Sequence, residues 1–194
     1  RSFEICQQYA AKDKRIHIIK KKNEGLYLAR KTGVDYASGD FVFFLDADDY
    51  ISDDCILKLY NLSQINEGMD IVYGNLCVVD EAGTVIVSDP PLSIGTHDAR
   101  EMLTFAISHY SWHIWGNLIR KDLLKQVVYW TDLDKYSFGE DAITMLQLYA
   151  LSKSIYVSND PVYFYLQRSS SMMHQKRIEL LHKNNFQFAK MLSR

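Results

Sequence analysis

The chain has 194 residues and a hydrophobic fraction of 47%, which is enough for one globular domain with a good core. Its net charge of −2 gives no sign of general nucleic-acid binding. The three cysteines are widely separated and lack metal-ligand spacing, which indicates reduced thiols and a cytoplasmic protein, and no apolar run reaches the roughly 18–20 residues of a membrane span.

The first part of the chain alternates expected helices and strands. Residues 3–12 have helical spacing, and the β-branched segment 15–20 predicts a short strand. A second helix is expected over about 26–36, and the apolar segment 40–45 predicts a strand that is covered on both faces. A third helix is expected over 52–66, counting its cap. This alternation is typical of an α/β domain with a mostly parallel central sheet.

The second part of the chain begins with a small antiparallel pair, expected over 70–80 and 84–88 around a turn. The segment 112–120 is ambiguous between helix and strand. No repeat or linker interrupts the sequence, so we expect a single domain over 1–194. Further helices are predicted at 96–108, 140–152 and 176–192, and further short strands at 154–158 and 162–167.

The strand at 40–45 runs directly into three acids, Asp46, Asp48 and Asp49. Ligands of open α/β sheets bind at the carboxyl ends of the strands, and neighbouring carboxylates repel one another unless a cation relieves them. Mg²⁺ takes oxygen ligands, typically one or two carboxylates together with substrate phosphates. We therefore predict that Asp46 and Asp48 bind metal and phosphate, whereas Asp53 and Asp54 favour the start of the next helix.

The segment RIHIIKKKNEGLYLARKTGVDYASGDFVFFLDADDYI resembles the nucleotide-binding half of family 2 glycosyltransferases, which have the GT-A fold. The family shows there an Asn-x-Gly loop, an Ala-Arg helix that ends in Ala-x-Gly, and an apolar strand into Asp-x-Asp-Asp. Downstream, the stretches DIVYGN, WGNLIRKDLL, FGEDAITML and VYFYLQRSSSMMH resemble further family motifs in the same order. Lys31 and Asn117 depart from the pattern, since the family usually has Asn and Lys there.

The resemblance implies a metal-dependent inverting glycosyltransferase of polysaccharide or cell-surface glycan synthesis. The donor would be a nucleoside diphosphate sugar, with a UDP-sugar favoured, and the acceptor a glycan or a lipid-linked sugar. The cofactor would be Mg²⁺ or Mn²⁺. Such chemistry needs neutralisation of the leaving diphosphate, a base for the acceptor hydroxyl, and in-line alignment. The resemblance also implies a location at the cytoplasmic face of the membrane, with peripheral association.

The same resemblance assigns roles to individual residues. Asp141 would be the general base and Glu140 would position the acceptor, although acids in a helix's first turn are also favoured by the helix dipole alone. Asp48 would coordinate the metal, with His174 as a further ligand, and Trp115 would stack on the acceptor sugar. The residues expected to contact the nucleotide sugar are Asn23, Arg30, Asp46, Arg168 and Ser171.

Two other function classes fit parts of the sequence. A nucleotidyltransferase also uses metal-binding carboxylates on an α/β sheet, but the Gly-Glu-Asp stretch at 139–141 argues against it. A non-catalytic module that binds nucleotide sugars or glycans would keep the fold without turnover. The family's domain normally opens with a strand-helix-strand unit, and residues 1–10 resemble the helix after it. We therefore expect the native protein to carry about thirty further residues at its N-terminus.

Overall fold

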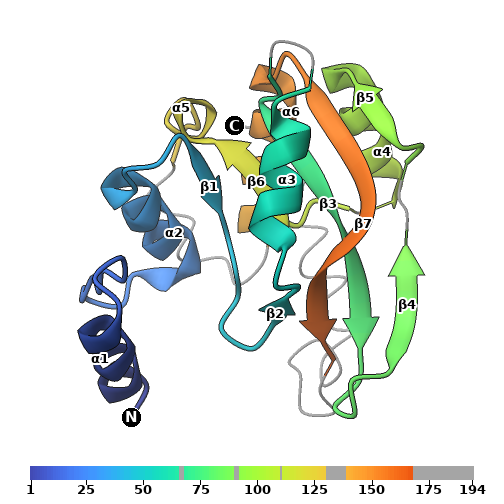
Figure 1. Ribbon diagram of the computed structural model, residues 1–194. Coiled ribbons are helices and arrows are strands. Elements are labelled where there is room, and N and C mark those ends of the chain that lie inside the picture. Colours follow the sequence, from blue (N-terminus) through green and yellow to red (C-terminus); the bar gives the residue numbers. More distant parts are fainter. Residues whose placement is uncertain (66–67, 90–91, 110, 130–138, 168–194) are drawn as a thin grey trace, which may run out of the picture.

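The structure is a computed structural model that describes residues 1–65, 68–89, 92–109, 111–129 and 139–167. It is an α/β fold in which helices surround one strongly curved sheet (Figure 1). The helices are α1 (Ser2–Lys12), α2 (Gly25–Tyr36), α3 (Cys55–Ser63), α4 (Ala99–His109), α5 (Lys121–Leu124) and α6 (Glu140–Leu151). The strands are β1 (Phe41–Phe43), β2 (Tyr50–Ile51), β3 (Ile71–Val79), β4 (Val85–Asp89), β5 (Gly95–His97), β6 (Asn117–Arg120) and β7 (Ile155–Leu166).

The α/β class is confirmed, but the sheet is mixed rather than mostly parallel. Its strand order is β1-β6-β3-β7-β2, with β4 added to β3 and β5 added to β7. Only β3 and β7 pair in parallel among the described strands. The reason is β6, from the ambiguous segment 112–120, which lies between β1 and β3 and runs antiparallel to both. The expected antiparallel pair of β3 and β4 is confirmed.

Two expected strands differ from the structure. The segment 15–20 contains no strand, and the side chains of Ile16, Ile18 and Ile19 are all more than a third exposed. The two short strands expected at 154–158 and 162–167 are one curved strand, β7. Its Pro161 lies opposite Asn75, where the ladder to β3 is irregular, and such an irregularity accommodates a proline that would otherwise end a strand. The helix expected at 176–192 lies outside the described residues.

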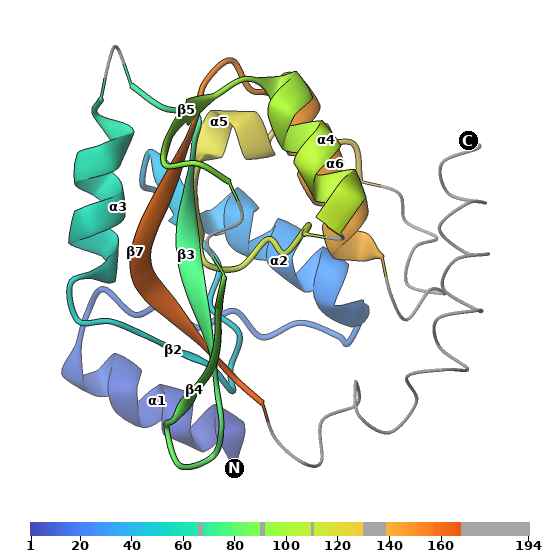
Figure 2. The same cartoon turned by 90° about the vertical axis from the view of Figure 1, so that its right-hand side faces the viewer.

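Both faces of the sheet are covered. Alternate residues of a strand point to opposite faces, and β3 shows this clearly. Ile71 and Tyr73 pack with residues of α4 and α6, whereas Val72 packs with Cys55 and Leu59 of α3. Figure 2 shows α3 on one side of β3 and β7 and α2, α4 and α6 on the other. This double cover explains why β3 is almost continuously buried, as in the apolar strands of α/β proteins.

None of the helices in the described residues is both long enough and apolar enough to cross a bilayer.

Candidate functional site

The acidic segment forms a tight turn that begins three residues after the last residue of β1. The Asp49 backbone N–H donates a hydrogen bond of 3.2 Å to the Asp46 carbonyl oxygen. The Asp46 side chain is 30% exposed, whereas Asp48 is exposed and its carboxylate receives no hydrogen bond or ion pair from the described residues. We call residues 46–49 the acidic turn. It presents one carboxylate that is already paired and one that remains open to solvent.

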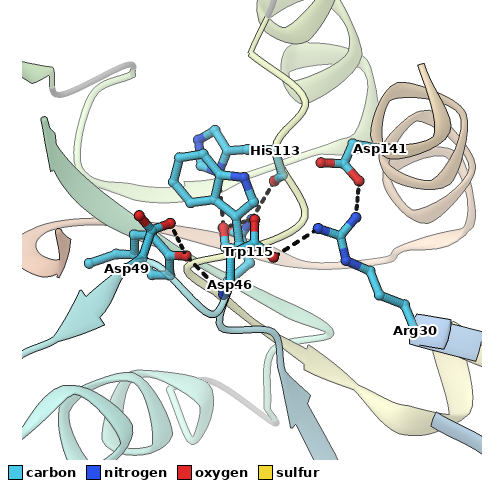
Figure 3. A network of polar contacts seen from close by, with 8 residues as sticks. Arg30, Asp46, Asp49, His113, Trp115 and Asp141 are labelled. Carbon is cyan, nitrogen blue, oxygen red and sulfur yellow. Dashed lines mark hydrogen bonds and ion pairs between the residues drawn. The ribbon is translucent and has the colours of Figure 1, made fainter. Parts of the chain in front are cut away.

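Arg30 of α2 joins the acidic turn to the first turn of α6 (Figure 3). Its Nη2 lies 3.1 Å from Asp46 Oδ1, and its Nη1 donates to Asp141 Oδ1. The arginine side chain is only 10% exposed, so both ion pairs are partly shielded from water. Charge-assisted hydrogen bonds of this kind are stronger than those between neutral groups. Three residues that the sequence singled out therefore lie together, although they come from three different elements.

The environment of Asp141 brings the pKa of its carboxyl group close to neutral pH. Gly139 precedes α6 with a φ of 101°, a left-handed conformation that glycine adopts without strain, and the helix begins at Glu140. Burial raises the pKa of Asp141 to about 6, while the charge of Arg30 acts in the opposite direction. A general base works best with a pKa near the working pH. The local chemistry of Asp141 therefore suits the acceptance of a proton.

The remaining expected site residues differ in what the structure shows. Asn23 lies just before α2, and its Oδ1 accepts a 3.1 Å hydrogen bond from the Gly25 backbone N–H. Glu140 is partly buried in the first turn of α6, next to Asp141. Arg168, Ser171 and His174 lie outside the described residues.

Trp115 belongs to a stack of aromatic rings. Its ring centroid lies 4.3 Å from that of His113, 4.6 Å from Tyr163 and 5.5 Å from Tyr165. The Trp115 carbonyl oxygen can only accept, so His113 Nδ1 donates to it at 3.0 Å and Nε2 accepts from the Tyr73 hydroxyl at 2.7 Å. Burial lowers the pKa of His113 to about 4, which keeps the ring neutral at pH 7. Trp115 is half-buried and packs against these three rings.

Sequence reasoning missed the contact that fastens the acidic turn to the sheet. The hydroxyl of Tyr163, in β7, donates to Asp49 Oδ2 at 2.6 Å and accepts from the Asp46 backbone N–H at 3.2 Å. The other carboxylate oxygen of Asp49 accepts from the Leu166 backbone N–H at 3.0 Å. Burial raises the pKa of Tyr163, so its hydroxyl keeps the proton that it donates. Asp49, one of the three acids that follow the apolar segment in the sequence, is therefore bound to β7.

The donor atoms of the acidic turn fit a hard divalent cation. Carboxylate oxygens are the ligands that Mg²⁺ and Mn²⁺ prefer, and Asp46 and Asp48 supply them one residue apart. Within the described ranges, no cluster of three or more His, Cys, Asp or Glu side chains could hold a metal by itself. This arrangement matches sites in which one or two carboxylates share the cation with substrate phosphates.

Comparison with known proteins places the chain in a family. Residues 1–134 match the model of the family described as glycosyl transferase family 2. Glycosyltransferase GlyA of Streptococcus pneumoniae is 29% identical over 184 residues, covering 88% of this chain and 25% of that protein. The uncharacterized glycosyltransferase EpsJ of Bacillus subtilis is 28% identical, covering 89% of this chain and 51% of its own length. The chain thus spans about a quarter to a half of these relatives.

A solved structure supports the same fold. Residues 1–349 of TarS from S. aureus, in complex with UDP-GlcNAc, superpose with a TM-score of 0.67 and 19% sequence identity. The match covers 90% of this chain and 48% of that one. The GT-A type of fold that the sequence motifs indicated is therefore confirmed.

Proposed function

The chain belongs to glycosyltransferase family 2, and we propose that it transfers a sugar from a nucleoside diphosphate sugar to an acceptor hydroxyl. The observation that carries this proposal is the position of Arg30 between two acids. Asp46 follows the strand that leads into the donor side of the site, and Asp141 begins the helix that offers a base. One guanidinium contacts both, so donor binding and proton removal are brought to a single place.

In the proposed reaction, the acceptor oxygen attacks the anomeric carbon from the side opposite the leaving diphosphate. The new carbon–oxygen bond forms as the bond to the diphosphate oxygen breaks, and the electron pair of that bond leaves with the diphosphate. The acceptor proton passes to the Asp141 carboxylate, whose pKa of about 6 allows it to be ionised at pH 7 and still basic. Inversion at the anomeric carbon follows from attack in line with the leaving group.

The acidic turn is the proposed donor side. Asp48 would hold a divalent cation together with the donor phosphates, and Asp46 would contact the ribose or assist the cation. Such a cation, when bound, neutralises the charge that grows on a leaving diphosphate. Arg30, Asn23, Arg168 and Ser171 complete the proposed donor contacts. Uracil is the favoured base of the donor nucleotide, because the similar TarS structure contains UDP-GlcNAc.

The aromatic stack is the proposed acceptor side. The Trp115 ring is held in place by three neighbouring rings, and Trp and Tyr side chains offer flat apolar surface next to polar groups. Glu140, beside the proposed base, would hydrogen-bond an acceptor hydroxyl. A glycan acceptor in polysaccharide or cell-surface glycan synthesis fits this combination. A lipid-linked form of that acceptor, met at the cytoplasmic face of a membrane, is the more specific part of the proposal.

A thermal-shift screen tests the donor half of the proposal. The protein would be heated with UDP, GDP, CDP and UDP-sugars, each with Mn²⁺ and with a chelator. We expect one nucleotide to raise the melting temperature only with metal, because a ligand that binds the native state stabilises it. Asp48→Ala should abolish that shift. Asp53→Ala is the matched control, since Asp53 is an exposed acid nearby that we assign to the following helix, and it should keep the shift.

Turnover separates the enzyme from a binding module. A protein that is stabilised by a UDP-sugar should release UDP slowly from it in the presence of Mn²⁺ and faster once a suitable glycan acceptor is added. Stabilisation by nucleotide sugars without any UDP release would favour the non-catalytic reading. The absence of a shift with every nucleotide would contradict the proposed function.

A further inference from the structure

Asp49 differs from the other two acids of the acidic turn because both of its carboxylate oxygens are occupied. Oδ2 accepts from the Tyr163 hydroxyl at 2.6 Å, and Oδ1 accepts from the Leu166 backbone N–H at 3.0 Å. Asp48, in contrast, is exposed and receives no hydrogen bond from the described residues. The turn therefore has one acid that faces solvent and one that is fastened to strand β7. Such a division of roles indicates that Asp49 holds the turn in place.

The hydroxyl of Tyr163 is placed by a ring that is enclosed on several sides. Tyr163 has no exposed surface, and its ring stacks on Trp115 with centroids 4.6 Å apart. Gly116 lies against it with a φ of 77°, and a Cβ atom at that position would approach the Tyr163 Cβ and Cγ atoms to 3.3 Å. The same hydroxyl accepts from the Asp46 backbone N–H at 3.2 Å. The hydroxyl of an enclosed ring thus contacts both the first residue of the turn, Asp46, and the last, Asp49.

The turn needs such a restraint because it is crowded with negative charge. Three carboxylates within four residues repel one another, and Arg30, the one cation among the described residues that contacts them, reaches only Asp46 of the three. Without the side-chain contacts to β7, the turn would keep only its own hydrogen bond from the Asp49 N–H to the Asp46 carbonyl oxygen and the backbone pairing of β2 that follows it. A restraint made before the donor arrives also reduces the entropy that donor binding must overcome.

We propose that Tyr163 is a positioning residue, which together with Asp49 latches the acidic turn to strand β7 and so presets Asp46 and Asp48 for the donor. We call the Tyr163 hydroxyl and the Asp49 carboxylate the latch. This inference rests on the proposed function, because it assigns the latch a role in donor binding. It also links the turn to the end of β7 at Leu166, two residues before Arg168, a residue proposed to contact the diphosphate.

Tyr163→Phe tests the latch because it removes the hydroxyl and keeps the ring. Amide hydrogen exchange, measured by NMR on the full chain, reports the turn directly. The Asp46 and Leu166 amides should exchange about tenfold faster in the variant, in line with the loss of one hydrogen bond. Binding of UDP with Mn²⁺, measured by calorimetry, should weaken by about tenfold. Tyr156→Phe is the matched control, since it removes a hydroxyl near the opposite end of the same strand, and it should change neither quantity.

Asp49→Asn changes the same contact from its other side, so the test does not depend on the folding of Tyr163→Phe alone. The variant keeps one side-chain acceptor, and combining it with Tyr163→Phe gives a double-mutant cycle. The two changes should be strongly non-additive in both exchange and binding if the residues act as one latch. Unchanged exchange in Tyr163→Phe overturns the latch, and faster exchange with unaltered UDP affinity overturns its role in positioning. A wild-type protein that does not bind UDP with Mn²⁺ overturns the proposed function and the donor role of Tyr163 with it, and the exchange rates then report on the turn alone.

Discussion

Two arginine–aspartate pairs lie at opposite ends of strand β1, and they are built differently. Arg120 and Asp70 lie at the start of β1 and β3, where Arg120 pairs with Phe41 across the sheet. They line a cleft of about 750 Å³ together with Thr96, Lys153 and Ser154. Arg30 and Asp46 lie beyond the end of β1. Both regions hold a partly buried ion pair, so an ion pair alone does not identify the proposed functional end.

The charge balance separates the two regions. Asp70 accepts from the Lys153 backbone N–H at 2.7 Å and lies 3.5 Å from Arg120 Nε, whose guanidinium also donates to the Met69 carbonyl oxygen. Its carboxylate thus ties neighbouring chain segments together. Arg30, in contrast, faces two carboxylates at once, and Asp48 adds a third nearby without a partner in the described residues. Carboxylates that outnumber the cations beside them repel one another unless a bound cation joins them, so this balance supports the proposed site at the acidic turn rather than at Asp70.

The largest expected effect is on Asp141. Asp141→Asn should lower kcat by a factor of about 10²–10⁴, the range that general-base catalysis contributes. Stability should stay the same or rise, because burial disfavours the charged carboxylate that the variant removes. UDP release with acceptor, and urea unfolding, would be measured on the same preparations. A variant that keeps wild-type turnover would show that another group takes the acceptor proton.

The next largest effect is the pH dependence that the Asp141 carboxyl group gives to activity and stability. Its pKa is raised to about 6, so kcat/KM should fall tenfold per unit as the pH drops below about 6. The stability effect has the opposite direction, because a raised carboxyl pKa favours the folded state when protonated. That contribution to the unfolding free energy is therefore lost as the pH rises from about 4 to about 6. A pH series of initial rates and of urea midpoints would check both directions.

Arg30→Met should move the acid limb of that profile to higher pH, because the charge of Arg30 lowers the pKa of Asp141. The variant also loses two charge-assisted hydrogen bonds, so its free energy of unfolding should fall by about 2 kcal/mol. Lys31→Met is the matched control, since the neighbouring Lys31 pairs with Asp35 on the exposed side of the same helix. A limb that stays at the wild-type pH in Arg30→Met would mean that Arg30 does not tune Asp141.

The sequence predicted the helices and strands better than it predicted which strands pair in the sheet. Helical periodicity predicted α1, α2, α4 and α6 to within a few residues. Helices α2, α4 and α6 each bury part of their surface, whereas no residue of α1 is buried. Pairing could not be read in this way, since β6 inserts between β1 and β3 from a segment with no clear period. Pro161 made one strand resemble two, because the irregular ladder that accommodates it depends on β3.

The arrangement of the candidate site was visible in the sequence only in part, for a similar reason. Acids at the end of a strand and at the start of a helix are visible locally, and the family motifs added Arg30 and Asp141. The partnership of Tyr163 with Asp49 joins residues 114 positions apart, and no local pattern indicates it. Burial of Asp141, which decides its pKa, likewise depends on helices and strands that meet only in the folded chain.

The ion pair of Asp70 with Arg120, to which we assign a structural role, gives a smaller effect. Asp70→Asn keeps one carbonyl oxygen as an acceptor but loses the charge opposite Arg120, so the unfolding free energy should fall by about 1–2 kcal/mol. UDP affinity should stay at the wild-type value, because the residue lies at the far end of β1 from the acidic turn. Urea unfolding and calorimetry would measure the two quantities. A loss of UDP affinity that exceeds the loss of stability would remove the distinction between the two regions.

The smallest expected effect belongs to Asn23, which the family resemblance assigned to the nucleotide and the structure places at the start of α2. Its Oδ1 accepts from the Gly25 N–H, so Asn23→Ala should cost about 1 kcal/mol, as the loss of a helix-start side chain does. Asn23→Asp keeps that acceptor, removes the amide N–H donors and adds a negative charge. If the amide contacts the donor, Asn23→Asp should retain most of the stability and still bind UDP more weakly. Equal UDP affinity in Asn23→Asp and wild type would instead assign Asn23 to the structural group, beside Asp70, and leave Arg30 as the contact from α2 to the functional end.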